Sequence, residues 1–119
     1  MKRKDAILEE YGSLASEHFT TLEKLVVSQE DPLDGEDVLS RVSVMLSLLG
    51  GGPNYRTLHL SFYGVMDLNI RLPYGYNTLG FLDIQSIREY QWAHLHYWVK
   101  SAENDYLSFY CKQCSIQVE

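Results

Sequence analysis

Cysteine is scarce in this sequence, which has only Cys111 and Cys114 among its 119 residues. A signal peptide is also missing, because the first residues are charged and continue into an amphipathic stretch without an apolar segment. No window approaches the roughly eighteen consecutive apolar residues of a membrane-spanning helix. These absences argue against a membrane protein and predict a cytoplasmic protein whose thiols stay reduced.

Positive charge is in short supply as well. The chain has 10 lysines and arginines against 16 aspartates and glutamates, with a net charge of −6 and a pI near 5.1. Its one basic run, at residues 2–4, is too short to hold a nucleic-acid backbone, which is bound by clusters of lysine and arginine. We therefore expect no nucleic-acid partner, and the negative field favours a protein partner with a basic surface.

The sequence does contain enough apolar material for a folded core. Hydrophobic residues make up 45% of the 119 residues and aromatic residues 13%, so we expect a single domain over residues 1–119. The first segment places Ile7, Leu8 and Tyr11 at helical spacing, and Gly12 suits a helix end. Residues 18–29 are ambiguous: the leucines suit a helix, but the threonines and valines favour a strand, which we prefer.

Residues 57–72 show the clearest periodicity in the chain. Large apolar side chains occupy alternate positions from Leu58 to Leu72, and mainly polar side chains occupy the others. This period of two is that of a strand with one buried and one solvated face. Gly64 interrupts the apolar face, where a missing side chain often marks a bend or bulge. The pattern predicts either one long bent strand or two strands that share a corner.

Turn residues separate the other strand-like runs. Residues 50–55 join two apolar runs in a predicted hairpin, and residues 101–105 form the loop of a second one. Further strands are predicted near residues 78–87 and at the end of the chain. The expected fold class is α+β: a short N-terminal helix followed by an antiparallel sheet of about six or seven strands, in mostly sequential (meander) order, bent or partly rolled.

Catalytic motifs are absent from the sequence. It has no Gly-x-Ser-x-Gly nucleophile elbow, no His-Glu-x-x-His zinc motif and no glycine-rich phosphate loop followed by a lysine. The glycines at residues 50–52 join two predicted strands and suit a hairpin loop. We therefore expect no enzyme activity and no cofactor.

The C-x-x-C spacing of Cys111 and Cys114 is the nearest approach to a chemical motif. Redox pairs place the first cysteine at a helix N-terminus, whereas strand-like runs flank this pair. A zinc site needs four ligands, so His94 and His96 would have to join the two cysteines. The apolar alternation changes parity between the cysteines, which favours a β-bulge with both thiols facing the core. We prefer this structural role and keep a small metal- or ligand-binding domain as the alternative function.

Acidic and aromatic residues are the remaining candidates for a binding surface. Complementary charge speeds the association of proteins, and aromatic side chains anchor interfaces. A solvated acidic loop is the alternative interpretation of the same charges. The predicted partner-binding residues are Asp31, Asp34, Glu36, Asp37, Glu103, Asp105, Tyr74, Tyr76 and Trp92.

Two stretches resemble small β-rich bacterial proteins that are often encoded beside toxin genes. One is an L-x-F-x-G-V-x-D-L strand and the other a late strand ending in cysteine. The matching residues are Leu60, Phe62, Gly64, Val65, Asp67, Leu68, Leu107, Ser108, Phe109 and Cys111. The resemblance implies an immunity protein that binds and blocks a cognate toxin domain through a variable surface, so it transfers no site residues. The acidic charge agrees with a basic toxin domain as the partner.

Overall fold

The described residues of the computed structural model form one helix and eight strands. These residues are 6–14, 18–29, 41–51, 56–72, 79, 82–87, 95–101 and 106–119. The elements are α1 (Ala6–Ser13), β1 (Phe19–Gln29), β2 (Val42–Gly50), β3 (Thr57–Tyr63), β4 (Met66–Ile70), β5 (Leu82–Ser86), β6 (Tyr97–Ser101), β7 (Leu107–Cys111) and β8 (Gln113–Val118). The predicted N-terminal helix and the strand preferred over residues 18–29 are confirmed. No helix in this part of the chain is long and apolar enough to cross a membrane.

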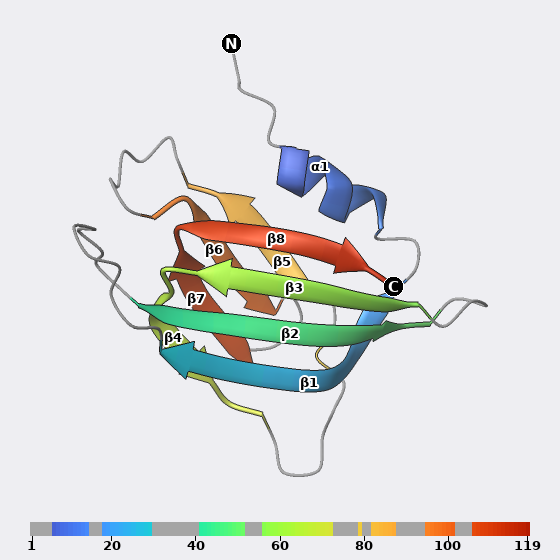
Figure 1. The fold of residues 1–119 in the computed structure, drawn as a ribbon, viewed down its shortest axis with the longest axis horizontal. Coiled ribbons are helices and arrows are strands. Elements are labelled where there is room, and N and C mark those ends of the chain that lie inside the picture. The colour runs from blue at the N-terminus through green and yellow to red at the C-terminus, as the bar shows by residue number, and fades with distance from the viewer. Residues whose placement is uncertain are drawn as a thin grey trace.

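The strands form two sheets, not the single sheet of about six or seven strands that the sequence predicted. Sheet A has the order β1-β2-β3-β8 and sheet B the order β4-β7-β6-β5. All pairs are antiparallel, as expected. Sheet A lies in front of sheet B in Figure 1, and the strands of the two sheets cross steeply. The predicted sequential order is correct for β1-β2-β3 and for β5-β6-β7. It is wrong for β8 and β4, which pair with the distant strands β3 and β7.

The chain passes between the sheets at two neighbouring points. β3 leads into β4 through Gly64 and Val65, and β7 leads into β8 through Lys112. The Lys112 N–H donates to the carbonyl oxygen of Tyr63 at 2.9 Å, which holds the two crossing points together. Strands that switch sheets need such a bend, and this paired corner divides the predicted single sheet into two. Of the two interpretations of residues 57–72, two strands sharing a corner is therefore correct.

The hydrophobic core fills the space between the sheets. The rings of Phe62 in sheet A and Phe109 in sheet B meet edge to face, with centroids 4.9 Å apart and an interplanar angle of 71°. Aliphatic side chains at alternate positions of the central strands surround this pair. Those that are fully buried include Val44, Leu46, Leu48, Leu58, Leu60, Val99 and Leu107.

Helix α1 closes one side of the space between the sheets. It lies beside β8 and β5, which are the edge strands of sheets A and B on that side (Figure 1). The side chain of Tyr11 is buried, and its hydroxyl donates to the carbonyl oxygen of Leu82 at 2.6 Å. Burial raises the pKa of the Tyr11 hydroxyl, so the group stays protonated and able to donate. The helix is therefore a covering element of the core.

Candidate functional site

The nine residues predicted to bind a partner all lie outside the described residues. Their binding role therefore stays a prediction. They are Asp31, Asp34, Glu36, Asp37, Glu103, Asp105, Tyr74, Tyr76 and Trp92.

Cys111 and Cys114 both lie in the core, as the preferred interpretation of their spacing predicted. Both are buried and both are free thiols. The predicted β-bulge is wrong, because the chain turns at Lys112 from sheet B into sheet A, and each thiol faces the core from a different sheet. Burial, with a smaller contribution from Cys114, raises the pKa of the Cys111 thiol. A buried, protonated thiol is a poor nucleophile and a poor metal ligand.

The metal-binding alternative required His94 and His96 beside the two cysteines. The backbone N–H of His96 does donate to the carbonyl oxygen of Cys111, at 2.9 Å. Tyr97, however, pairs with Cys111 in register, so Tyr97 shares the core face with the thiol. His94 lies outside the described residues. In the part of the chain that the structure describes, no group of three histidine, cysteine or acidic residues is placed to hold a metal ion. The alternative therefore has no support.

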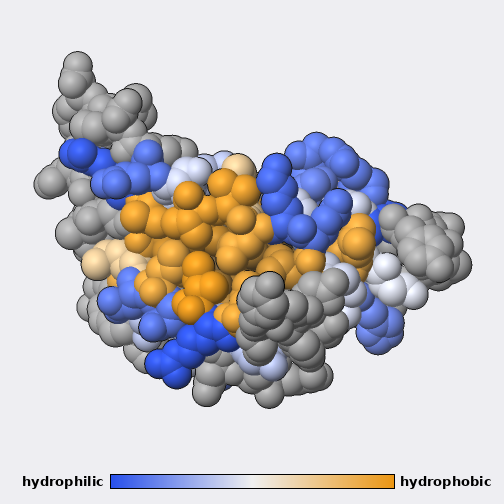
Figure 2. Space-filling model, turned by 90° about the horizontal axis from the view of Figure 1, so that it is seen from below, coloured by the Kyte–Doolittle hydropathy of each residue, from blue (hydrophilic) through white to orange (hydrophobic). Residues whose placement is uncertain are grey.

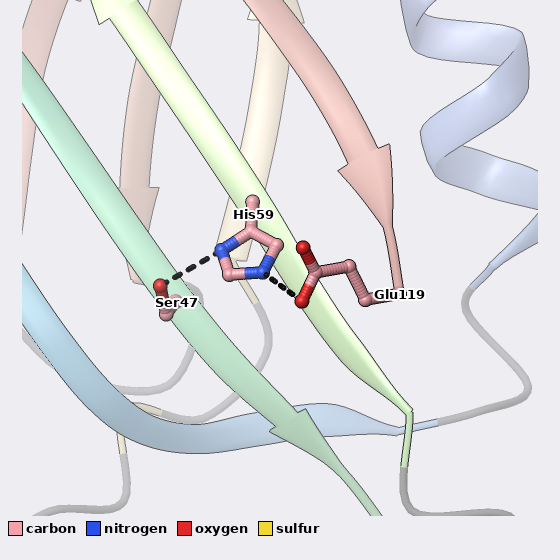
Figure 3. Close-up of polar contacts among 3 residues, drawn as sticks. All are labelled: Ser47, His59 and Glu119. Atoms are coloured by element: carbon pink, nitrogen blue, oxygen red, sulfur yellow. Dashed lines mark hydrogen bonds and ion pairs between the residues drawn. The ribbon is translucent and has the colours of Figure 1, made fainter.

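A polar cluster occupies the outer face of sheet A (Figure 3). The Oγ atom of Ser47 lies 3.0 Å from Nδ1 of His59, and Nε2 of His59 lies 3.2 Å from Oε2 of Glu119. Ser47 and His59 are partners in the register of β2 and β3, and the backbone of Glu119 exchanges hydrogen bonds with Thr57. Alternation along the strands turns all three side chains away from the core.

The cluster has the residue types of a hydrolase triad but not its geometry. In such triads the serine contacts Nε2 of the histidine and the carboxylate contacts Nδ1. Here Ser47 contacts Nδ1 and Glu119 contacts Nε2, so the two nitrogen atoms are exchanged. Ser47 also lies in a strand paired on both sides, so the backbone amides around it are engaged in the sheet and cannot form an oxyanion hole. Nε2 of His59 is enclosed, and the carboxylate of Glu119 beside it makes no well-aligned hydrogen bond to it.

An open hollow of about 300 Å³ lies on the same face, over β1, β2 and β3. Val26 and Met45 pair in register and form its apolar part, while Glu23, Lys24 and His59 line it with polar groups. Met45 is 44% exposed. A hollow with an apolar centre and a polar border can accept an apolar side chain of a protein partner.

The hollow was not predicted from the sequence, in which Val26 and Met45 both lie in mainly apolar runs. One signal could have revealed it. Met45 has the parity of Ser43 and Ser47, not that of the buried Val44 and Leu46.

The side of the molecule opposite α1 exposes further hydrophobic residues. Its edge strands are β1 in sheet A and β4 in sheet B. Val27 of β1 is 47% exposed and Ile70 of β4 is 39% exposed. Figure 2 views the molecule from this side and shows a hydrophobic area bordered by hydrophilic residues. Exposed hydrophobic areas of this kind often mark a protein interaction surface.

The comparisons with known proteins bear on the whole chain. The model of the family described as immunity protein PIM8 matches residues 4–117. Comparisons with curated proteins and with solved structures gave no match. The matched range includes both stretches that resemble immunity-type proteins, so that resemblance is confirmed. The chain belongs to the PIM8 family of immunity proteins.

Proposed function

We propose that this immunity protein binds a cognate toxin domain directly and neutralises it by occluding the active surface of the toxin. The observation that carries the proposal is the family match over residues 4–117. An immunity role implies a protein toxin as the partner. The hydrophobic area on the side of β1 and β4 supports binding by contact, since monomeric proteins seldom expose large contiguous hydrophobic areas without use. The exposed large hydrophobic residues of these two edge strands are Val27 and Ile70.

Neutralisation by occlusion requires no catalytic group. Within the described residues, the groups that most resemble a catalytic site are unsuited to catalysis. The Cys111 thiol is buried and protonated, and the contacts of His59 with Ser47 and Glu119 are the reverse of those in a hydrolase. These features support a protein that acts by stoichiometric binding.

The proposed partner has a basic surface, and the proposed place of action is the cytoplasm. A net charge of −6 attracts a basic toxin domain and speeds the encounter. The two cysteines are free thiols, which suits a reducing compartment.

Co-expression with the toxin encoded by the neighbouring gene tests the proposal. We expect cells that produce both proteins to grow, and cells that produce the toxin with an unrelated acidic protein to stop growing. In a mixture of the purified proteins, toxin activity should fall linearly and vanish at about one equivalent, because each bound copy blocks one toxin. Undiminished toxin activity at excess immunity protein would refute direct neutralisation.

Recovery of the toxin separates occlusion from chemical inactivation. The complex is dissociated in urea, the two proteins are separated, and the toxin is refolded. Occlusion predicts a toxin of unchanged mass that regains its activity. An altered mass, or inactivation by far less than one equivalent, would show that the immunity protein acts as an enzyme.

A further inference from the structure

The two sides of the sandwich are covered unequally. On one side α1 packs against the edge strands β8 and β5, and its Tyr11 hydroxyl is bonded to Leu82. On the other side the edge strands are β1 and β4 (Figure 1), and the described residues include no helix there. The core is therefore closed by the chain itself at one side only, as far as the described residues show.

Core-facing positions reach the surface on the open side. Val27 pairs in register with Val44 and Ile70 pairs with Leu107, and both of these partners are buried between the sheets. Paired residues share one face of a sheet, so Val27 and Ile70 point toward the core side. They are nevertheless 47% and 39% exposed, and Figure 2 shows the hydrophobic area on this side. Among the described residues, the inner face of the sandwich is thus left partly uncovered along β1 and β4.

The two halves of β1 differ in how well their exposed edge is protected against pairing with another strand. In the first half, the carbonyl oxygen of Thr20 accepts a hydrogen bond from the N–H of Leu79 at 2.8 Å, and the register shifts between Leu22 and Lys24. From Leu25 to Ser28 the pairing with β2 is regular, and the sequence has no charge, proline or glycine. Proteins protect edge strands from pairing with other chains by such charges, prolines and bulges. The second half of β1 lacks all of these protections.

The acidic charge that follows β1 in the sequence indicates the chemistry of the partner. Five acidic residues occupy the eight positions that follow Gln29 in the sequence, and the whole chain carries a net charge of −6. A strand that binds here therefore needs apolar side chains at alternate positions, to cover Val27, and lysine or arginine beside them, to match the acidic charge.

We propose that the edge of β1 over residues 25–28 pairs with an exposed β-strand of the toxin domain that has this apolar and basic pattern. The added strand extends sheet A, offers hydrogen bonds to an edge for which the described residues supply none over residues 25–28, and covers the core-facing side chain of Val27. This inference rests on the proposed immunity function and names the surface that performs it.

The test compares two lysine substitutions of exposed residues at opposite edges of sheet A. The probe is the toxin domain encoded by the neighbouring gene, carrying a substitution that inactivates it. Val27→Lys places a charge where the added strand packs, and we expect Kd to rise at least about tenfold. Ser115→Lys is the matched control, because Ser115 is exposed but lies on the outer face of β8, the opposite edge strand of sheet A. We expect its Kd to stay within about threefold of the unsubstituted protein.

Hydrogen exchange of the unsubstituted protein gives a second measurement that needs no variant. Strand addition predicts that amides within residues 25–28 become protected in the complex. Loss of binding by a third variant, Met45→Lys, while Val27→Lys binds normally, or protection confined to residues 43–47 and 59–63, would instead place the toxin on the outer face and overturn the inference. A free protein that sediments as a dimer, and that Val27→Lys makes monomeric, would show that a second copy occupies the edge.

The two proposals fail in different ways. If the unsubstituted protein does not bind the toxin domain, the immunity proposal fails and the inference falls with it. If the unsubstituted protein and Val27→Lys bind equally well, the immunity proposal stands and only the β1 surface is wrong.

Discussion

The Cys111 thiol faces the space between the sheets, with Tyr97 as its partner in the register of β6 and β7. Burial keeps the thiol neutral, so its spacing from Cys114 does not make a reactive pair. His59 shows the same principle on the outer face. Its neighbours Ser47 and Glu119 resemble a catalytic set in composition, but the atoms they contact give them only a structural and electrostatic role. At this scale the environment of a side chain decides its chemistry.

Titration of Cys111 makes the stability of the protein depend on pH. Burial raises the pKa of this thiol in the folded state. Above about pH 8.5 the unfolded chain loses the proton while the folded chain keeps it, so the unfolded state binds fewer protons. The free energy of unfolding should therefore be level below that pH and fall above it, by up to about 1.4 kcal/mol per pH unit for this group. Urea unfolding at pH 7.5, 8.5 and 9.5 measures the slope.

The variant Cys111→Ala serves as the comparison for this slope. It removes the titrating group, so the decline between pH 8.5 and 9.5 should become shallower even though the smaller side chain lowers stability at every pH. If stability fell equally steeply with pH in the two proteins, the decline could not be assigned to the Cys111 thiol.

The corner formed by Gly64 and Lys112 determines how the strands are shared between the sheets. It sends β3 into β4 and β7 into β8, so one two-stranded ribbon contributes to both sheets. Gly64 has a φ of 66°, and a Cβ at this position would lie 3.0 Å from the Cβ of Lys112. Both the conformation and the close approach require a residue without a side chain.

Substitution of Gly64 by alanine should destabilise the protein. The left-handed backbone conformation and the contact with Lys112 together predict a loss of about 1–3 kcal/mol in the free energy of unfolding. Gly12→Ala is the matched control, since Gly12 is helical and exposed, and an added Cβ would approach no other described segment within 4 Å. It should raise stability by up to about 1 kcal/mol. Urea unfolding compares the two, and a Gly64→Ala protein as stable as Gly12→Ala would disprove the role of the corner.

The whole molecule combines an acidic charge with a sandwich closed by α1 on one side. The helix is tied to sheet B by the bond from Tyr11 to Leu82, while β1 and β4 expose Val27 and Ile70 on the opposite side. The charge acts over a longer distance than these contacts, so it affects the rate of encounter more than the lifetime of the complex.

Salt should therefore slow association with the toxin domain. We expect the association rate constant to fall about tenfold or more between 20 mM and 500 mM NaCl, with a much smaller change in the dissociation rate. Asp34→Asn with Glu36→Gln tests the acidic stretch, and Glu9→Gln with Glu10→Gln on α1 is a control of equal charge change. A larger decrease in the association rate constant for Asp34→Asn with Glu36→Gln than for the control would support the predicted role of the acidic residues. An association rate independent of salt would contradict a basic partner.

Local patterns in the sequence were sufficient to predict many elements of the fold. The alternation from Leu58 to Leu72 with Gly64 at its centre indicated the corner, and turn residues indicated that β2 pairs with β3 and β6 with β7. These features depend on side-chain period and turn chemistry, which are properties of short segments. For the candidate site the sequence placed His59 on a polar face, but the acidic and aromatic residues it singled out lie outside the described residues.

By itself, the sequence determined the strand periods, the N-terminal helix, the burial of both cysteines and the membership in an immunity protein family. The tertiary structure alone decided that β8 pairs with β3, that β4 pairs with β7 and that α1 covers β8 and β5. It also decided that Val27 and Ile70 face the core side and remain exposed. The reason is physical: pairing and coverage between distant segments depend on which surfaces meet in space, and an apolar residue has the same local pattern whether a neighbour covers it or not.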